Sequence, residues 1–298
     1  MRFDQYMERC LYDPTAGFYA TGRGRAGRRD ADFVTSPEVG PLFGAVLALQ
    51  LDRWWDEAGR PDPFVVVDAG TGPGTLLRSL EIAAPACAAA WVLAGLDPVR
   101  GNASLDLLDD LEGGVVIANE LLDNLPGRVV ERTADGWLEL HVHDGKGELR
   151  PLDGSPPPFD LPVGARAPWL ERAAAWVGDV LARNPAHLVA FDYGLPTTQG
   201  LIERGGWLRT YRGHERGDDP FADPGERDIT FDVAFDQLPP PRRLATQAEL
   251  LAEWGIEALV EEGRQYWADH AARPDLTALR MRSRVREAEA LTDHDALG

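Results

Sequence analysis

Residues 68–74 are the segment best suited by type and spacing to bind a cofactor. Asp68 is followed by Gly70, Gly72 and Gly74, and an apolar stretch at 64–67 precedes it. Glycines allow a tight turn and let backbone N–H groups approach a ligand closely. A strand that ends in an acid and leads through such a turn into a helix is typical of nucleotide-type cofactor sites. The alternative is an ordinary turn between a strand and a helix.

A second polar segment follows another apolar stretch. Asn119, Glu120 and Asp123 come directly after residues 115–118, where a buried strand would end. In doubly wound folds, ligands bind outside the carboxyl ends of the strands. Two carboxylates and an amide at this edge suit a cationic or hydrogen-bonding substrate. The alternative is a helix start with polar capping residues.

A third strand ends in an acid at Asp192, which Tyr193 follows, and His214 lies in the loop beyond. We take Asp192, Tyr193 and His214 as candidate catalytic residues, although a loop histidine is equally typical of a surface. His141 and His143 alternate along one expected strand. No further ligands can be assigned beside them, so the sequence predicts no metal site.

The elements that must position these residues follow from hydrophobic periodicity and turn signals. Continuous apolar runs predict buried strands, and broad apolar faces predict helices. An alternating segment around a turn at 134–136 predicts a hairpin, and residues 194–227 are predicted to be a long polar loop. The strands are expected at 64–67, 91–94, 115–118, 188–191 and 229–235, and the helices at 41–58, 75–84, 168–183, 247–254 and near the C-terminus.

Charge and composition exclude several classes of function. The formal net charge is −19, whereas binding a nucleic-acid backbone requires clustered Lys and Arg, so we expect no nucleic-acid partner. The N-terminus is charged where a signal peptide would be apolar, and no uncharged stretch is long enough to cross a bilayer. Only two cysteines occur, without metal-ligand spacing. These features predict a soluble cytoplasmic protein without membrane insertion.

Several separated motifs, in order along the chain, resemble one family, the MidA-type methyltransferases. They cover the N-terminal segment, the segment after residue 118, and a region near residues 192–247. The matching residues are Tyr6-Met7, Leu11-Tyr12-Asp13-Pro14, Gly17-Phe18-Tyr19, Asp32-Phe33-Val34-Thr35-Ser36-Pro37-Glu38, Asn119-Glu120 with Asp123, Leu125 and Pro126, Asp192-Tyr193-Gly194, the run from Gly206 to His214, Asp219-Pro220, Pro224-Gly225-Glu226, Asp228-Ile229-Thr230 and Thr246-Gln247.

The resemblance implies an α/β fold: a doubly wound, Rossmann-like core with a seven-stranded sheet and an added substrate-binding region. It implies S-adenosyl-L-methionine as cofactor and arginine methylation of a protein such as a respiratory complex I subunit, because mitochondrial relatives act in complex I assembly. Glu120, supported by Asp123 or Asp192, would orient the guanidinium. The cofactor-binding set would be Thr35, Pro37, Glu38, Asp68, Gly70, Gly72, Gly74, Asp97 and Asn119, with residues 35–38 as a candidate lid.

The chain departs from the family pattern at two places. Asp68 stands where the family usually has Glu, and only residues 97–114 separate two predicted strands where the family has a further helix and strand. Asp97 is our candidate for the ribose hydroxyls.

We expect an N-terminal lid and helical segment at 1–63 and a methyltransferase core at 64–298, with substrate-binding elements at 128–165 and 194–235. Two alternatives stay open on the same scaffold. One is a small-molecule O- or N-methyltransferase, and the other is a non-catalytic assembly chaperone. The sequence leaves open whether the chain is a monomer or a homodimer.

Overall fold

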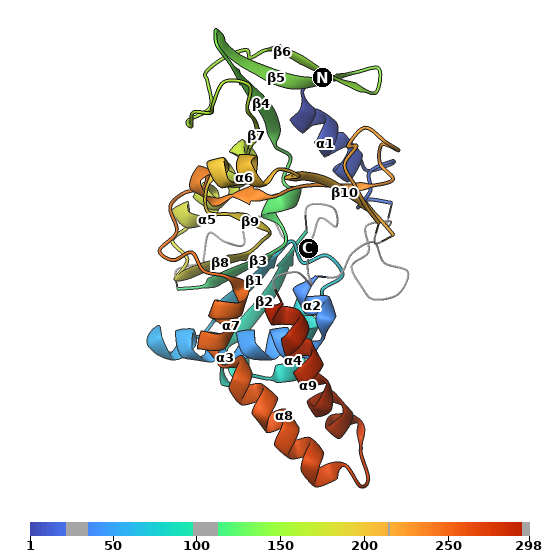
Figure 1. Cartoon of the computed structure of the whole chain (residues 1–298). Coiled ribbons are helices and arrows are strands. Elements are labelled where there is room, and N and C mark those ends of the chain that lie inside the picture. The colour runs from blue at the N-terminus through green and yellow to red at the C-terminus, as the bar shows by residue number, and fades with distance from the viewer. Residues whose placement is uncertain (22–34, 98–112, 214, 294–298) are drawn as a thin grey trace.

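A computed structural model describes residues 1–21, 35–97, 113–213 and 215–293 (Figure 1). Its central element is a parallel sheet with the strand order β2-β1-β3-β8. These strands are β1 (Phe64–Ala69), β2 (Trp91–Leu96), β3 (Val115–Asn119) and β8 (His187–Phe191). Because β2 and β3 lie on opposite sides of β1, the chain reverses direction across the sheet between β1 and β3. Ligands of open α/β sheets bind at such a switch point.

Both faces of the parallel sheet are covered, because successive residues of a strand point to opposite sides. In β3, Val115 and Ile117 join one hydrophobic cluster, and Val116 and Ala118 join another. Helix α5 (Glu171–Ala182) packs on the second face through Val180. The parallel α/β fold predicted from the sequence is thereby confirmed. A seven-stranded sheet is not confirmed, because the described residues place four strands in it.

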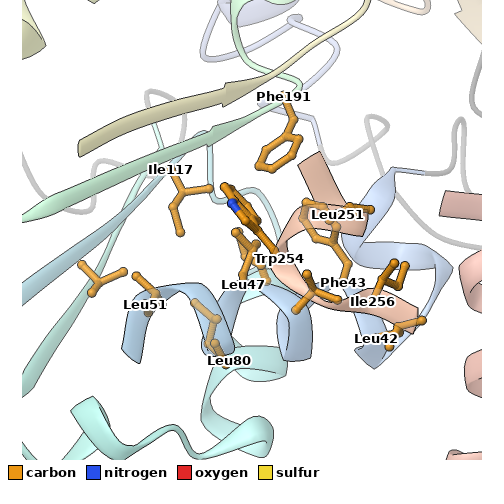
Figure 2. Packing of buried hydrophobic residues seen from close by; sticks show 14 of the residues in the cluster. Leu42, Phe43, Leu47, Leu51, Leu80, Ile117, Phe191, Leu251, Trp254 and Ile256 are labelled. Atoms are coloured by element: carbon orange, nitrogen blue, oxygen red, sulfur yellow. The ribbon is translucent and has the colours of Figure 1, made fainter. Parts of the chain in front are cut away.

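The largest hydrophobic cluster lies between the first face and the helices α3 (Pro41–Glu57), α4 (Thr75–Ala83) and α7 (Gln247–Trp254). Figure 2 shows the side chains of α3 and α7 meeting those of β3 and β8. Gly44 of α3 sits against Ser79 of α4, where a Cβ would lie only 2.4 Å from the Ser79 Cβ. Helices α8 (Ile256–His270) and α9 (Leu276–Thr292) form a hairpin that extends away from the sheet (Figure 1).

A second layer lies beyond the carboxyl ends of the parallel strands (Figure 1). It contains an antiparallel sheet in the order β6-β5-β4-β7 and helix α1 (Phe3–Tyr12), which pack into a shared hydrophobic cluster. Its strands are β4 (Arg128–Thr133), β5 (Gly136–His143), β6 (Lys146–Pro151) and β7 (Arg166–Trp169). The predicted hairpin is confirmed in β4 and β5, which pair antiparallel.

The prediction of a polar loop at 194–227 is wrong. This segment contains β9 (Gly194–Leu195), α6 (Thr198–Arg204), β10 (Leu208–Arg212) and β11 (Glu215–Gly217). Strand β10 pairs with β12 (Asp228–Phe231), and β9 pairs with β13 (Val233–Ala234). Arg209 is buried and pairs with buried Asp232, which also pairs with the exposed Arg204, so a charged side chain is buried where the sequence pattern indicated exposure. Polarity is a poor guide to exposure when opposite charges pair inside the fold.

A short helix, α2 (Ser36–Val39), precedes α3, and a 3-10 turn, η3 (Leu122–Asn124), follows β3. Further 3-10 turns are η1 (Ala86–Ala89) and η4 (Phe235–Gln237). None of the helices in the described ranges is both long and apolar enough to span a membrane.

Candidate functional site

The glycine-rich loop after β1 has the backbone conformation that its glycines permit. Gly70, Gly72 and Gly74 have φ values of 79°, 47° and 76°, which residues other than glycine rarely adopt. The N–H groups of Gly70 and Thr71 donate to the carbonyl of Leu96, at 2.8 and 3.0 Å. The loop is therefore tied to the end of β2 before α4 begins at Thr75.

Two buried acceptor atoms beside this loop have no hydrogen-bond partner in the described part of the chain. They are Oδ2 of Asp68 and Oδ1 of Asn119, on the neighbouring strands β1 and β3, and the Thr71 hydroxyl of the loop is likewise buried without a partner in these residues. Burial raises the pKa of Asp68 to about 7, and the charge of Asp97 adds to the rise. Buried acceptors without donors are costly, so they indicate a ligand that supplies N–H groups. An ammonium group has that chemistry.

Glu120 occupies a left-handed backbone conformation, with φ of 51°, directly after β3. Its N–H donates to the Phe191 carbonyl at 2.8 Å, which continues the sheet pairing by one residue. Its Oε1 accepts from the Ser36 N–H and the Asn119 Nδ2, both at 3.2 Å. Burial raises the pKa of Glu120 to about 8, and the nearby charge of Asp123 contributes. A strained residue at this position is a common feature of functional sites.

Asp123 and Asp192 lie in the same buried region. Asp192 Oδ2 accepts from the N–H of Leu122 at 2.8 Å, which fixes the turn η3 against the end of β8. Burial raises the pKa of both aspartates, and the charge of Asp123 raises that of Asp192 further. We call Glu120, Asp123 and Asp192 the acid cluster. Its members are like charges that favour either bound protons or a bound cation.

Tyrosines surround the acid cluster. Burial raises the pKa of Tyr193, and the charges of Glu120, Asp123 and Asp192 raise it further. Tyr12 and Tyr19 stack with their ring centroids 5.6 Å apart. The Tyr19 hydroxyl contacts Asn124 Oδ1 and donates to Asp228 Oδ1 at 3.0 Å. These rings enclose the cluster on the side of the second layer.

The structure brings most of the predicted site residues together. The loop after β1 touches the turn after β3, because a Cβ on Gly70 would lie 3.3 Å from the Leu121 Cβ. Asp97 directly follows β2. Its charge raises the pKa of both Asp68 and Tyr12, so it lies near both side chains. His214 lies outside the described residues. The described residues contain no group of three or more His, Cys, Asp or Glu able to hold a metal ion.

The candidate lid, residues 35–38, lies within the described part of the chain. Thr35 precedes α2, Pro37 is buried within it, and α2 contacts α4 and α9. Glu38 lies in the same turn, where its N–H donates to the Thr35 carbonyl at 2.9 Å. Within α2, the residue that reaches the acid cluster is Ser36, which the sequence placed in the lid without assigning it a role.

Other residues at the site were missed from the sequence. All of them are distant in sequence from the cofactor loop. They lie in the motifs that resemble the family, and that resemblance is the signal that could have identified them. They are Tyr12, Tyr19, Asp228, Thr230 and Gln247.

Comparison with known proteins identifies related chains. A family model described as "Putative S-adenosyl-L-methionine-dependent methyltransferase" matches residues 102–253. Protein arginine methyltransferase NDUFAF7, mitochondrial, of Xenopus tropicalis is 26% identical over 85% of this chain and 71% of that protein. The Drosophila melanogaster homolog is 41% identical over 26% of this chain, which covers only 17% of the fly protein's length. The human protein is 25% identical over 81% of this chain and 64% of its own length.

A solved structure is also similar along the whole chain. It is a "likely methyl transferase" from Burkholderia thailandensis with S-adenosyl-homocysteine bound, and it superposes with a TM-score of 0.77 at 28% identity. The comparison covers 100% of this chain and 85% of that one. Together with the family match, this confirms S-adenosyl-L-methionine as the cofactor. The unpartnered acceptors at Asp68 and Asn119 fit its amino-acid end.

The relatives correct one prediction. The cytoplasmic location predicted from the sequence is wrong by this comparison, because the named relatives are mitochondrial proteins. The physical reason is that two reduced, buried cysteines argue against an oxidising compartment but do not distinguish one reducing compartment from another.

Proposed function

Since this chain belongs to the S-adenosyl-L-methionine-dependent methyltransferase family whose model it matches, we propose that it methylates an arginine side chain of a protein. The observation that supports this acceptor is the acid cluster of Glu120, Asp123 and Asp192 beside the cofactor loop. A guanidinium group is planar, always charged and rich in donors, and carboxylates bind it through paired hydrogen bonds. Such a cation would relieve the repulsion within the cluster.

Some residues around the cofactor loop would bind the cofactor, and others would bind the arginine acceptor. Asp68 and Asn119 would hold the ammonium group of the cofactor, and the glycine loop would let its amino-acid end approach the backbone. Asp97 would hold the ribose hydroxyls. The cofactor supplies an electrophilic methyl group, so the protein's contribution is mainly alignment and exclusion of water.

Glu120 would orient the guanidinium and accept the proton that its nitrogen loses when the new N–C bond forms. Burial raises the pKa of Glu120 and so makes its carboxylate a stronger base. The bound guanidinium would favour the ionised form of Glu120 before the transfer. Asp123 and Asp192 would bind the remaining N–H groups. Tyr193, the other described candidate from the sequence, would line the acceptor side.

We further propose that the acceptor side is built by the second layer and the N-terminal segment. Tyr19 comes from residues 1–63 and Thr230 from residues 194–235, and both contact the turn that contains Asp123. Tyr19 also donates to Asp228, which lies in the same region as Thr230. Residues 128–165 would extend this surface. A protein acceptor agrees with the names of the relatives, which are protein arginine methyltransferases, and a respiratory complex I subunit is the acceptor that the family resemblance implies.

The test is to incubate the purified chain with methyl-labelled S-adenosyl-L-methionine and a lysate, then hydrolyse the labelled protein. We expect label in methylarginine. Glu120→Gln should lower transfer about a hundredfold while cofactor affinity stays within about threefold, because this carboxylate acts on the acceptor. Label found only in small metabolites would favour the small-molecule alternative and contradict the proposal.

A further inference from the structure

Gln247 lies between two segments that are far apart in sequence. It is the first residue of α7, whose start is fixed by a capping box between Thr246 and Glu249. Its Nε2 donates to the Leu291 carbonyl at 2.8 Å, near the end of α9. Its Oε1 accepts from the Ser36 hydroxyl at 2.9 Å. Since a carbonyl can only accept, the Leu291 bond fixes which way the Gln247 amide points.

Ser36 continues this line of hydrogen bonds into the acid cluster. Its side chain is 2% exposed and its hydroxyl is committed to Gln247. Its backbone N–H, at the start of α2, donates to Glu120 Oε1 at 3.2 Å. Three successive hydrogen bonds therefore join α9 to Glu120.

A second contact of α9 holds the other end of the same segment. The buried Glu287 carboxylate accepts from the N–H of Leu42 at 2.9 Å, at the start of α3. Gly40 allows this approach, because a Cβ there would lie 2.3 Å from the Glu287 Cδ. Helix α9 thus holds the chain on both sides of α2, through Gln247 at Ser36 and directly at Leu42 of α3.

We propose that Gln247 is a positioning residue that holds the Ser36 N–H against the Glu120 carboxylate and thereby couples helix α9 to the acid cluster. The inference rests on the proposed function in treating Glu120 as the group that acts on the acceptor. It gives a role to the Thr246-Gln247 pair, which lies far along the chain from the cofactor loop.

The groups that face Glu120 determine how the Ser36 hydrogen bond affects its protonation. Asp123 and Asp192 repel its ionised form, Tyr193 and Asn119 interact with its carboxylate, and the Ser36 N–H stabilises the ionised form. Among the described residues, those with the largest effect on the pKa of Glu120 include no Lys or Arg. Loss of the Ser36 hydrogen bond should therefore let Glu120 keep its proton to a higher pH.

The test compares Gln247→Leu, Ser36→Ala and the double variant in the full chain. Carbon-13 NMR of labelled glutamate carboxyls follows the titration of Glu120, which is assigned by its loss in Glu120→Gln. We expect each single variant to raise the midpoint by about half a pH unit, since one hydrogen bond to the carboxylate is weakened. The double variant should shift it no further, because both changes break the same line of hydrogen bonds.

Amide exchange of residues 36–39 should also become about tenfold faster in Gln247→Leu, because α2 loses a support. Gln265→Leu is the matched control, since the amide of Gln265 bonds only Glu261 on the exposed side of α8. Faster exchange with an unmoved Glu120 midpoint would show that Gln247 supports the packing of α2 without acting on Glu120, and would overturn the proposal. Additive midpoint shifts would do the same.

Ser36→Ala is the milder change and answers the question if Gln247→Leu fails to fold. Neither measurement uses a methyl acceptor, so failure of the arginine proposal leaves this test intact. Conversely, an unmoved midpoint together with methylarginine formation would reject the coupling alone.

Discussion

The hydroxyl of Thr230 donates a 2.6 Å hydrogen bond to Asp123 Oδ2, so strand β12 of the second layer binds directly to the turn that follows β3. The other carboxylate oxygen, Oδ1, is buried without a partner in the described part of the chain. The carboxylate is thus held from one side and open to a donor on the other. That arrangement suits a group that must be fixed in place and still receive a ligand.

Thr230→Val should destabilise the protein by about 1 to 2 kcal/mol, because it removes a hydrogen bond to a buried carboxylate without changing side-chain shape. The loss should be larger at pH 8 than at pH 5.5, since the ionised form of Asp123 needs the donor most. Urea unfolding at the two pH values measures it. Thr210→Val is the control, because the Thr210 hydroxyl is buried with no hydrogen-bond partner among the described residues and its removal should be close to neutral. Equal losses in the two variants would contradict the expectation.

Gly72→Ala should weaken cofactor binding at least about tenfold, because a φ of 47° strains any side chain and shifts the loop. Gly154→Ala places the same kind of substitution at a φ of 98° in open space, outside the site. The control should lose a comparable amount of stability and keep its affinity for S-adenosyl-L-methionine. Calorimetric titration of both variants separates strain from ligand contact. Equal affinity in the two would show that the loop does not touch the cofactor.

Binding of the cofactor at pH 7 should release a fraction of a proton from Asp68. Its pKa of about 7 means that the carboxyl is partly protonated before binding, and an ammonium partner stabilises the ionised form. Titrations in two buffers with different ionisation enthalpies give the number of protons released. Asp68→Asn should abolish the release and weaken binding about tenfold. Release that persists in this variant would assign the proton to another group.

The free protein should become less stable as pH rises from about 5 to about 8. Asp68, Glu120, Asp123 and Asp192 all hold protons more tightly in the folded state, because burial raises each pKa. The folded state therefore binds more protons than the unfolded chain between the unfolded pKa near 4 and the folded values of about 7 and 8. Thermal unfolding measures the fall in Tm.

The net charge of −19 also favours unfolding at high pH, so the series should be repeated in about 0.5 M salt, which screens exposed charges far more than buried ones. A fall that survives salt assigns the effect to the buried carboxyls. A Tm that rises over this range would contradict the raised pKa values.

Local signals were sufficient for the elements that present the cofactor loop. The apolar run at 64–67 and the three glycines that follow it predicted a strand, a turn and a helix, and these are β1, the loop and α4. The helix predicted at 247–254 coincides with α7, because Thr246 and Glu249 form a capping box that the sequence itself encodes. Residues 194–227 were misjudged because their strands are short and their buried charges pair only in the fold.

The sequence by itself determined the chemistry available at each strand end: glycines where the backbone must bend, and acids at the ends of β1, β3 and β8. Periodicity and turn chemistry are local, so they survive without a fold. Only the tertiary structure decided which distant side chains meet these acids. Ser36 contacts Glu120 across 84 positions of the chain, and Thr230 contacts Asp123 across 107. Gln247 contacts Ser36 across 211 positions, and such pairings depend on packing. Packing also sets the burial that raises each carboxyl pKa.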